Sequence, residues 1–281
     1  MNSLQFRAPK TVVKFGGSSL STPQRMTEVS KLVESLVNDG TDPTVVCSAM
    51  DKTTNNLLEA GEEALLHGTF DIGGLERLHL KTCKELDLGV DTVADIKGIL
   101  QDLHKMLTGV SMLGELTPRS KDKLVSYGEM MSIRILAETL NKNGIRAQHM
   151  DASKLGIHTD AEFGNADVLD KSYPAIKNKL NEHRGVVNVV PGFIGQSPCN
   201  HTTTLGRGGS DLTAMVIGSA INAEEIQLWK DVDGMMTANP REVPRAISVP
   251  RVSYEEASEM AYFGANILHP LSMHPGLEKV V

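Results

Sequence analysis

The residues best suited to chemistry lie in two glycine-rich segments, each of which follows a short β-branched run. The first reads KFGGSS over residues 14–19. Backbone amides after paired glycines can donate to a phosphate, and Lys14 can place a cation on a group in transfer. A strand-to-helix turn that needs glycine, with a surface lysine beside it, explains the same letters. Neither GxxxxGK(S/T) nor GxGxxG occurs in the chain, so the spacing alone leaves both interpretations open.

The second segment reads GRGGSD over residues 206–211 and combines three glycines with a guanidinium and a carboxylate. Each glycine gives up backbone entropy on folding, so this density in one loop needs a reason. Arg207 can hold a carboxylate in a bidentate fork, and Asp211 can accept from an ammonium or order a nearby lysine. Alternatively, Asp211 is only a helix N-terminal carboxylate that the helix dipole favours. The density of glycine favours a functional loop.

Weaker signals come from an acidic segment and from a single glutamate. Residues 230–234 read KDVDG, which suits ribose hydroxyls or a magnesium shell, and Arg241 can reach a nucleotide phosphate. An Asp-Gly turn explains this segment without a ligand. Glu129 stands in a predicted helix with an apolar face, where a charge is usually solvated at the edge of the core. Glu129 is therefore a candidate site residue only in combination with the other segments.

Alternating strands and helices are expected to position these segments. Strands are predicted at residues 11–15, 43–47, 147–150, 186–190, 202–205 and 226–229. Helices are predicted from an N-cap at Ser21 to residue 39, at 57–66, within an excursion over 72–114, and at 120–140, 173–180, 212–220 and 254–260, the last with a capping box. Residues 51–56 and 191–195 are expected to be loops. This order predicts a mostly parallel sheet covered on both faces, with ligands beyond the carboxyl ends of its strands.

The composition excludes several classes of protein. The chain has 281 residues, of which 40% are hydrophobic and 22% are charged, and these are globular proportions. The net charge is −7 and basic residues do not cluster, which argues against nucleic acid as a partner. No HExxH zinc motif occurs. The longest apolar stretch, residues 186–194, is interrupted and far shorter than the ~20 residues that span a bilayer, so no membrane partner is expected.

The cysteines and the first residues bear on the compartment. Cys47, Cys83 and Cys199 lie far apart, and an odd number fits a reducing compartment better than a disulfide framework. We expect all three to be buried or half-buried thiols. The first ten residues lack an apolar core and are too short for a transit peptide. The prediction is therefore cytoplasmic, with the plastid stroma as the alternative if a longer leader exists.

Taken together, the motifs resemble the amino-acid kinase superfamily and, more narrowly, the aspartate kinase family. The resemblance covers nearly the whole chain, from about residue 11 to 275. In the family's order, the motifs are KFGGSS at 14–19, SAM at 48–50 with Thr54 and Asn55, YGE at 127–129, the run 192–211, WKDVDG at 229–234, and FGA at 263–265 before ILHP at 267–270. LTPR at 116–119 and Lys230 favour the plant and algal branch. Asp51 departs from a glycine that is common in the family.

The resemblance implies a three-layer α/β sandwich with a mostly parallel central sheet. It also implies transfer of the ATP γ-phosphate to the β-carboxylate of L-aspartate, which gives 4-phospho-L-aspartate on the way to lysine, threonine and methionine. ATP with Mg²⁺ is the implied cofactor, with the metal bridging phosphates and held by few protein ligands, so no residue is assigned to it. This chemistry needs positioning and charge neutralisation, because the acceptor carboxylate is already a nucleophile.

The resemblance also assigns roles to residues. Lys14 would stabilise the moving phosphoryl group and is catalytic together with Asp211. Arg207 would hold the α-carboxylate of aspartate, and Glu129 and Asp211 would receive its ammonium. The aspartate pocket would be completed by Ser48, Thr54 and Phe193. The residues assigned to the nucleotide are Lys14, Gly16, Gly17, Ser18, Ser210, Lys230, Asp231 and Arg241.

The expected domains are an N-terminal extension over residues 1–10 and one catalytic domain over residues 11–281. Within the catalytic domain we expect an aspartate-binding N-lobe and an ATP-binding C-lobe from about residue 186. We expect the two regulatory domains that follow in the family to be absent, and with them feedback by lysine, threonine or S-adenosylmethionine.

Two alternatives to the aspartate kinase stay open. The first is a kinase for another carboxylate amino acid, glutamate or acetylglutamate. The second is a catalytically silent partner that binds nucleotide or assembles with a full-length aspartate kinase. A homo-oligomer is compatible with each of these functions.

Overall fold

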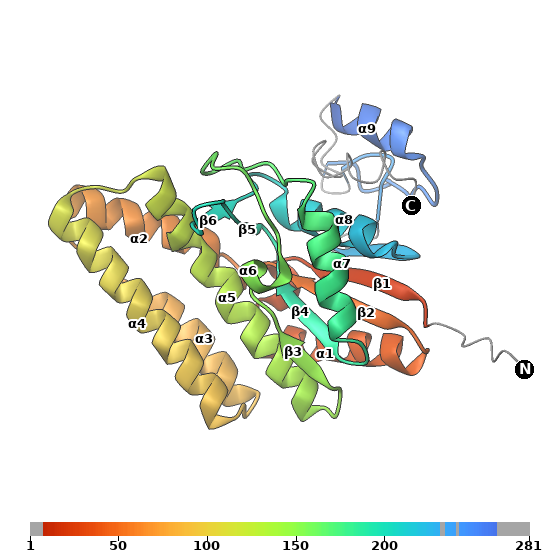
Figure 1. Ribbon diagram of the computed structural model, residues 1–281, viewed down its shortest axis with the longest axis horizontal. Helices are drawn as coiled ribbons and strands as arrows, with labels where there is room; N and C mark the ends of the chain where they lie inside the picture. The colour runs from red at the N-terminus through yellow and green to blue at the C-terminus, as the bar shows by residue number, and fades with distance from the viewer. Residues whose placement is uncertain (1–7, 231–233, 240–241, 263–281) are drawn as a thin grey trace, which may run out of the picture.

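The computed structural model describes residues 8–230, 234–239 and 242–262. Its central sheet orders five parallel strands as β3-β4-β2-β1-β7 (Figure 1). The strands are β1 (Lys10–Phe15), β2 (Asp42–Cys47), β3 (Ala147–His149), β4 (Val187–Pro191) and β7 (Glu225–Trp229). Each begins and ends within one residue of its predicted bounds, so the parallel sheet is confirmed. The sheet takes strands from both sides of residue 186.

Helices cover both faces of the sheet and complete three layers. One face packs against α1 (Pro23–Asn38) and α5 (Pro118–Lys142); the other packs against α6 (Ala152–Leu155), α7 (Ser172–Glu182) and α8 (Gly209–Ile221). Successive β1 residues serve both cores, since Val13 joins the core under α5 and Val12 the core under α8. A strand buried on both faces reads as a continuous apolar run. The predicted three-layer α/β sandwich is confirmed.

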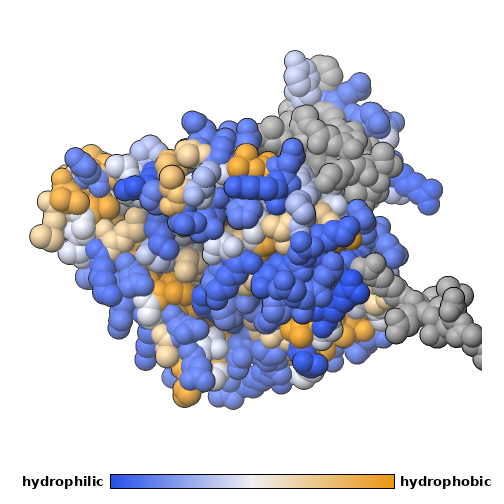
Figure 2. All heavy atoms as spheres, viewed as in Figure 1, coloured by the Kyte–Doolittle hydropathy of each residue, from blue (hydrophilic) through white to orange (hydrophobic). Residues whose placement is uncertain are grey.

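Residues 72–114 form the expected helical excursion. This excursion consists of α3 (Gly73–Glu85) and α4 (Val90–Leu113). Together with the preceding α2 (Thr53–His67), these helices surround α5 and extend its core. At one end the Oγ of Ser111 donates to the carbonyl of Gly68 at 2.6 Å, joining the ends of α2 and α4. Figure 2 shows hydrophobic surface at this tip, whereas the surface over α7 is mainly hydrophilic. The exposed apolar residues of α2 and α4 near this end include Leu66, Met112 and Leu113.

Several boundaries differ from the sequence prediction. The N-cap of α1 is Thr22, whose Oγ1 accepts from the Arg25 amide at 3.2 Å, whereas the Oγ of Ser21 donates to a preceding carbonyl. The helix α2 begins at Thr53, inside the expected loop 51–56, and α8 begins at Gly209, inside the second glycine segment. A loop was expected over residues 191–195, but its last two residues begin β5 (Ile194–Gln196), which pairs antiparallel with β6 (Thr202–Thr204). Tertiary contacts decide these ends more than residue preferences do.

Two short helices complete the described elements. Residues 18–20 form the 3₁₀ helix η1 (Ser18–Leu20), and α9 (Tyr254–Tyr262) lies near the C-terminal end of the described residues. The predicted capping box of α9 is confirmed, because the Ser253 amide donates to Glu256 and the Glu256 amide donates to Ser253. The short helix α6 had no signal in the sequence.

The cysteines only partly follow the prediction. Cys47 and Cys83 are buried, and burial raises the pKa of Cys83 to about 11 and raises that of Cys47 further. Cys199 is exposed in the turn between β5 and β6, so the expectation of burial is wrong there. Among the described residues, no helix has both the length and the hydropathy to cross a membrane.

Candidate active site

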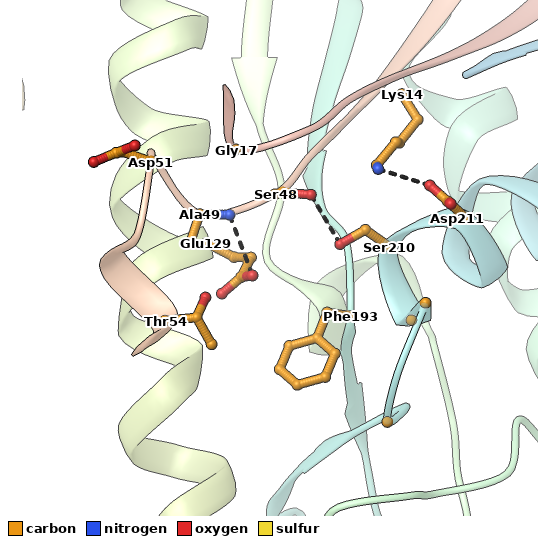
Figure 3. A pocket seen from close by; sticks show the side chains of 13 residues that line it. Lys14, Gly17, Ser48, Ala49, Asp51, Thr54, Glu129, Phe193, Ser210 and Asp211 are labelled. Carbon is orange, nitrogen blue, oxygen red and sulfur yellow. Dashed lines mark hydrogen bonds and ion pairs between the residues drawn. The ribbon is translucent and has the colours of Figure 1, made fainter. Parts of the chain in front are cut away.

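Four chain segments converge where the parallel strands end. Phe15 pairs with both Cys47 and Trp229, and Cys47 pairs with Pro191, so the ends of β1, β2, β4 and β7 lie at one level. The segments that follow β1, β2 and β4, with α5 and the turn into α8, border a cavity of about 290 Å³ (Figure 3). This is the edge at which α/β sheets bind ligands. The cavity is lined by Lys14, Gly17, Ser48, Ala49, Asp51, Thr54, Glu129, Phe193, Gly206, Gly208, Gly209, Ser210 and Asp211.

Asp211 joins two lysines on one wall of the cavity. The Nζ of Lys14 lies 2.6 Å from Oδ1 of Asp211, and the Nζ of Lys230 lies 3.2 Å from Oδ2. The side chains of Lys14 and Asp211 are each 9% exposed, so water screens this pair only weakly. Lys14 comes from β1, and Asp211 from the first turn of α8, where the helix dipole favours a carboxylate. Asp211 therefore both orders lysines and occupies the helix N-terminal turn.

Glu129 brings a buried carboxylate to the opposite wall. It is 3% exposed, and its Oε1 accepts from the amide of Ala49 at 3.2 Å (Figure 3). Its Oε2 has no hydrogen-bond partner among the described residues. Burial raises the pKa of Glu129 to about 8. The prediction that this charge is solvated at the edge of the core is therefore wrong, because Glu129 is buried.

Gly128 explains how Glu129 reaches the cavity. A Cβ at position 128 would lie 2.7 Å from the Cβ of Ala49 and 3.1 Å from a methyl carbon of Thr53. Only glycine lets α5 approach the segment after β2 this closely. The neighbouring Glu129 then meets the Ala49 amide, which accounts for the adjacent glycine and glutamate of the YGE motif.

The first glycine segment packs against the residues after β2. A Cβ at Gly17 would lie 2.8 Å from the carbonyl oxygen of Ala49, and the amide of Asp51 donates to the Gly17 carbonyl at 3.0 Å. Asp51 has a φ of 47°, in the left-handed region that favours glycine, which fits the glycine common at this position. Its side chain is exposed and points away from the Lys14–Asp211 pair in Figure 3. Gly16 leaves space beside the Nζ of Lys14.

The second glycine segment closes the cavity against β4. Gly206 and Gly208 have φ values of 71° and 75°, which side chains rarely adopt. A Cβ at Gly209 would lie 2.7 Å from the ring of Phe193, so this glycine lets the ring line the cavity. The Oγ of Ser48 donates to the Oγ of Ser210 at 3.1 Å and joins the end of β2 to the start of α8.

Other residues singled out in the sequence do not line the cavity. Arg207 is exposed and forms no ion pair with any described residue. Ser18 is exposed in η1, and Lys230 reaches the site through its contact with Asp211. Asp231 and Arg241 lie outside the described residues.

Sequence reasoning missed some groups that shape the site. The Ala49 amide that holds Glu129 is a backbone group and leaves no mark in the sequence. Gly192 begins the motif run 192–211 but received no role of its own, yet a Cβ there would lie 2.6 Å from the Cβ of Ser210. Asp122 on α5 was not singled out, although it is as buried as Glu129.

The two walls suit groups of opposite charge, an anion on the lysine wall and a cation on the α5 wall. The lysine wall carries one net positive charge beside a glycine segment, which suits a phosphoryl group. The α5 wall offers a buried carboxylate oxygen that no described residue hydrogen-bonds, which suits an ammonium. Among the described residues, no group of three or more histidine, cysteine or acidic side chains gathers as a metal site. The arrangement therefore fits phosphoryl transfer onto a small molecule that carries an amine.

The chain belongs to the amino acid kinase family, whose model matches residues 9–280. Among curated proteins it is similar to aspartokinase 2, chloroplastic, of Arabidopsis thaliana, with 47% identity over 94% of this chain and 49% of that protein. It is also similar to the aspartokinase of Schizosaccharomyces pombe, with 32% identity over 93% of this chain and 53% of that protein. The chain spans about half the length of these relatives.

Solved structures of aspartokinases share the fold. E. coli aspartokinase III in complex with aspartate and ADP superposes with a TM-score of 0.80 and 30% identity, over 96% of this chain and 60% of that chain. The aspartate kinase of Clostridium acetobutylicum gives a TM-score of 0.77 and 26% identity, over 96% of this chain and 58% of that chain.

Proposed function

We propose that this chain is the catalytic part of an aspartate kinase, which transfers the γ-phosphoryl group of ATP to the β-carboxylate of L-aspartate. The observation that carries the proposal is the buried Oε2 of Glu129, which has no hydrogen-bond partner among the described residues and lies across one cavity from the Lys14–Asp211–Lys230 cluster. The names of similar proteins support the same substrate, since one solved relative is described in complex with aspartate and ADP.

The α5 wall would bind the amino-acid part of aspartate. An ammonium beside Oε2 of Glu129 supplies the missing partner and favours the ionised carboxylate. Arg207 extends from the loop that borders the cavity, so the α-carboxylate is a natural partner for its guanidinium. Ser48, Thr54 and Phe193 complete the proposed pocket. Binding at both ends of the amino acid would direct the β-carboxylate toward Lys14.

The lysine wall would stabilise the phosphoryl group in transfer. A β-carboxylate oxygen forms a bond to the γ-phosphorus while the bond from phosphorus to the bridging oxygen of ADP breaks. No general base is needed, because the carboxylate is deprotonated at neutral pH. Lys14 neutralises charge on the moving group, the amides of Gly16 and Gly17 donate to it, and Asp211 keeps the two lysines in place.

We assign ATP with Mg²⁺ as the phosphoryl donor. Both carboxylate oxygens of Asp211 already face lysine ammonium groups, so this carboxylate is a poor ligand for the metal. Magnesium would instead be held by the phosphates and would neutralise part of their charge. The described part of the proposed nucleotide side consists of Lys14, Gly16, Gly17, Ser18, Ser210 and Lys230, and Asp231 and Arg241 complete the proposal.

Glu129 also discriminates between the alternative substrates. The nitrogen of acetylglutamate is an amide without charge, so this substrate would leave the buried carboxylate without a cation. Glutamate keeps the ammonium and differs from aspartate by one methylene, which is worth only about 1–3 kcal/mol of selectivity. Glutamate is therefore the closer competitor, and the silent partner stays as the alternative from a different class.

The test is ADP release with magnesium-ATP and L-aspartate, beside glutamate and acetylglutamate. Hydroxylamine in the assay traps the acyl phosphate as a hydroxamate, which identifies the carboxylate that was phosphorylated. We expect turnover with aspartate, and a rise of at least tenfold in its KM in Arg207→Ala. Arg184→Ala, which removes an exposed arginine at the end of α7, is the matched control. A folded chain without turnover would favour the silent partner, and faster turnover with glutamate would reassign the substrate.

The wider assignments are also proposals. We keep one catalytic domain over residues 11–281, with an aspartate-binding N-lobe and an ATP-binding C-lobe from about residue 186. Two compartments are proposed, the cytoplasm and the plastid stroma, and the chloroplastic names of the Arabidopsis relatives support the second. Assembly with itself or with a full-length aspartate kinase can be measured by sedimentation of the chain alone and in mixtures.

A further inference from the structure

A second buried carboxylate on α5, Asp122, lies two helical turns before Glu129. Seven residues advance about 10 Å along a helix and return to nearly the same face. Asp122 is 3% exposed, and three donors converge on it. Its Oδ2 accepts from the amides of Gly164 and Thr204 at 3.0 and 2.9 Å, and its Oδ1 accepts from Oγ1 of Thr204 at 2.8 Å. Asp122 does not line the cavity, so it can act there only through other residues.

The bonds to Thr204 fix the start of the second glycine segment. Thr204 ends β6, and its carbonyl also accepts from the Ala166 amide at 2.8 Å. The next residue, Leu205, donates its amide to the carbonyl of Phe193 at 2.9 Å. The chain then enters the left-handed turn at Gly206 and reaches Arg207. Arg207 therefore follows by three residues Thr204, which is bonded to Asp122 on α5.

The bond to Gly164 fixes a support for the same turn. Gly164 belongs to the loop between α6 and α7, and its neighbour Asn165 lies directly against Gly206, where a Cβ would collide with the Asn165 side chain. Asp122 thus holds both the strand that leads into the turn and the loop that packs beside it. A buried carboxylate that joins backbone amides of two segments restricts both.

We propose that Asp122 is a positioning residue for aspartate binding, which sets Arg207 at a fixed place relative to Glu129 on the same helix. The inference rests on the proposed function and on the role of Arg207 within it. Residues 209–211 belong to α8, whose packing on β1 holds Asp211 near Lys14 independently of Asp122. Loss of Asp122 should therefore weaken binding of aspartate and spare binding of ATP.

Substitutions at Asp122 and Thr204 test this. Asp122→Asn keeps one oxygen for the two amides and turns its own amide toward the Thr204 hydroxyl, which can accept, so this variant should fold. We expect KM for aspartate to rise about fivefold in Asp122→Asn and about tenfold in Asp122→Ala, no more than in Arg207→Ala, with KM for ATP within twofold of the wild type. Thr204→Val should raise KM for aspartate about threefold, and Thr204→Ser, which keeps the hydroxyl, should restore it.

Two controls separate positioning from general damage to the fold. Asp151→Asn removes the 3.2 Å ion pair between Asp151 and Arg134, which lies on α5 like Asp122. This variant should leave KM for aspartate unchanged. In an Arg207→Ala background, Asp122→Asn should raise KM for aspartate no further, because the residue through which it acts is gone.

The outcomes are distinguishable. Equal rises in KM for aspartate and ATP, an aspartate KM unchanged in both Asp122 variants, or full additivity with Arg207→Ala would overturn the positioning role. If Asp122→Ala does not fold, the Asn variant and the Thr204 pair decide the same question. A folded wild type without turnover on aspartate would instead remove the proposed function, and the inference with it.

Discussion

The two walls of the cavity differ in how their charges are balanced before a ligand binds. On the lysine wall, Asp211 already neutralises one of two ammonium groups, so the wall is ordered by its own contacts. On the α5 wall, Glu129 has one oxygen that meets no hydrogen-bond partner in the part of the chain that the structure describes, and its pKa is raised to about 8. An ordered electrostatic site favours catalysis, whereas an unsatisfied buried group favours a ligand that satisfies it. From this comparison we expect the lysine wall to determine the rate of phosphoryl transfer and the α5 wall to determine which substrate binds.

The largest effect should come from the lysine wall. Lys14→Met removes the cation next to the cavity and leaves Asp211 with Lys230 only. We expect kcat to fall on the order of 10³-fold, with little change in the KM for aspartate, because the lost charge acts mainly on the transition state. Steady-state ADP release measures this. Lys142→Met, which removes an exposed lysine paired with Asp87, is the control. A kcat within tenfold of the wild type would contradict the role of Lys14.

Substitution of Glu129 on the α5 wall should weaken the binding of aspartate and raise the stability of the fold. Glu129→Gln removes a carboxyl group whose ionisation burial opposes, so at pH 8 we expect the free energy of unfolding to rise by about 2–4 kcal/mol. The KM for aspartate should rise on the order of 100-fold, since the amide cannot pair with an ammonium. Chemical denaturation and kinetics measure the two changes. Glu138→Gln, on the same helix, is the control. A destabilised variant would show that Glu129 is a structural group.

The pH dependence of binding sharpens the same contrast. Below pH 8, Glu129 is mainly protonated in the ligand-free protein, and an ammonium must displace that proton. The affinity for aspartate should therefore rise about tenfold per unit between pH 6 and pH 7 and level off above pH 8. Calorimetric titration at several pH values measures this, with Glu129→Gln as the pH-independent reference. A flat profile for the wild type would mean that the ammonium binds elsewhere.

The smallest effect should come from the contact between β2 and α8. Ser48→Ala removes the hydroxyl bond to Ser210, which is worth about 1 kcal/mol, so KM for aspartate should rise about fivefold. Ser111→Ala removes a comparable bond at the far tip of α2 and α4 and should lower stability without changing KM. Equal kinetics in the two variants would place the Ser48 hydroxyl outside the binding site.

The strands and the glycine segments could be predicted because their physical requirements are local. A strand buried on both faces needs β-branched residues in succession, and β1 shows them directly. Left-handed turns and close backbone contacts need glycine, as at Gly206 and Gly17. Lys14 and Asp211 were found because each lies within such a segment.

The contacts between distant segments could not be predicted in the same way. The ion pair of Lys14 with Asp211 depends on the register of β1 with its neighbours and on the packing of α8. Glu129 looked like an edge charge because its partner is a backbone amide. Asp122 left no signal for the same reason, since two of its three donors are amides of segments that follow it in the chain.

The position of β1 between β2 and β7 in the sheet has a consequence for synthesis of the chain. One edge of β1 pairs with β2, which follows soon after it, but the other edge pairs with β7, which begins at Glu225. At about 5–20 residues per second, that edge waits on the order of 10–40 s for its partner strand on the ribosome. An unpaired edge is a template for association with other chains, so this interval is when the nascent protein is most exposed to aggregation. Lys14 is made early, and Asp211, which orders it and also pairs with Lys230, reaches it only when the sheet is nearly complete.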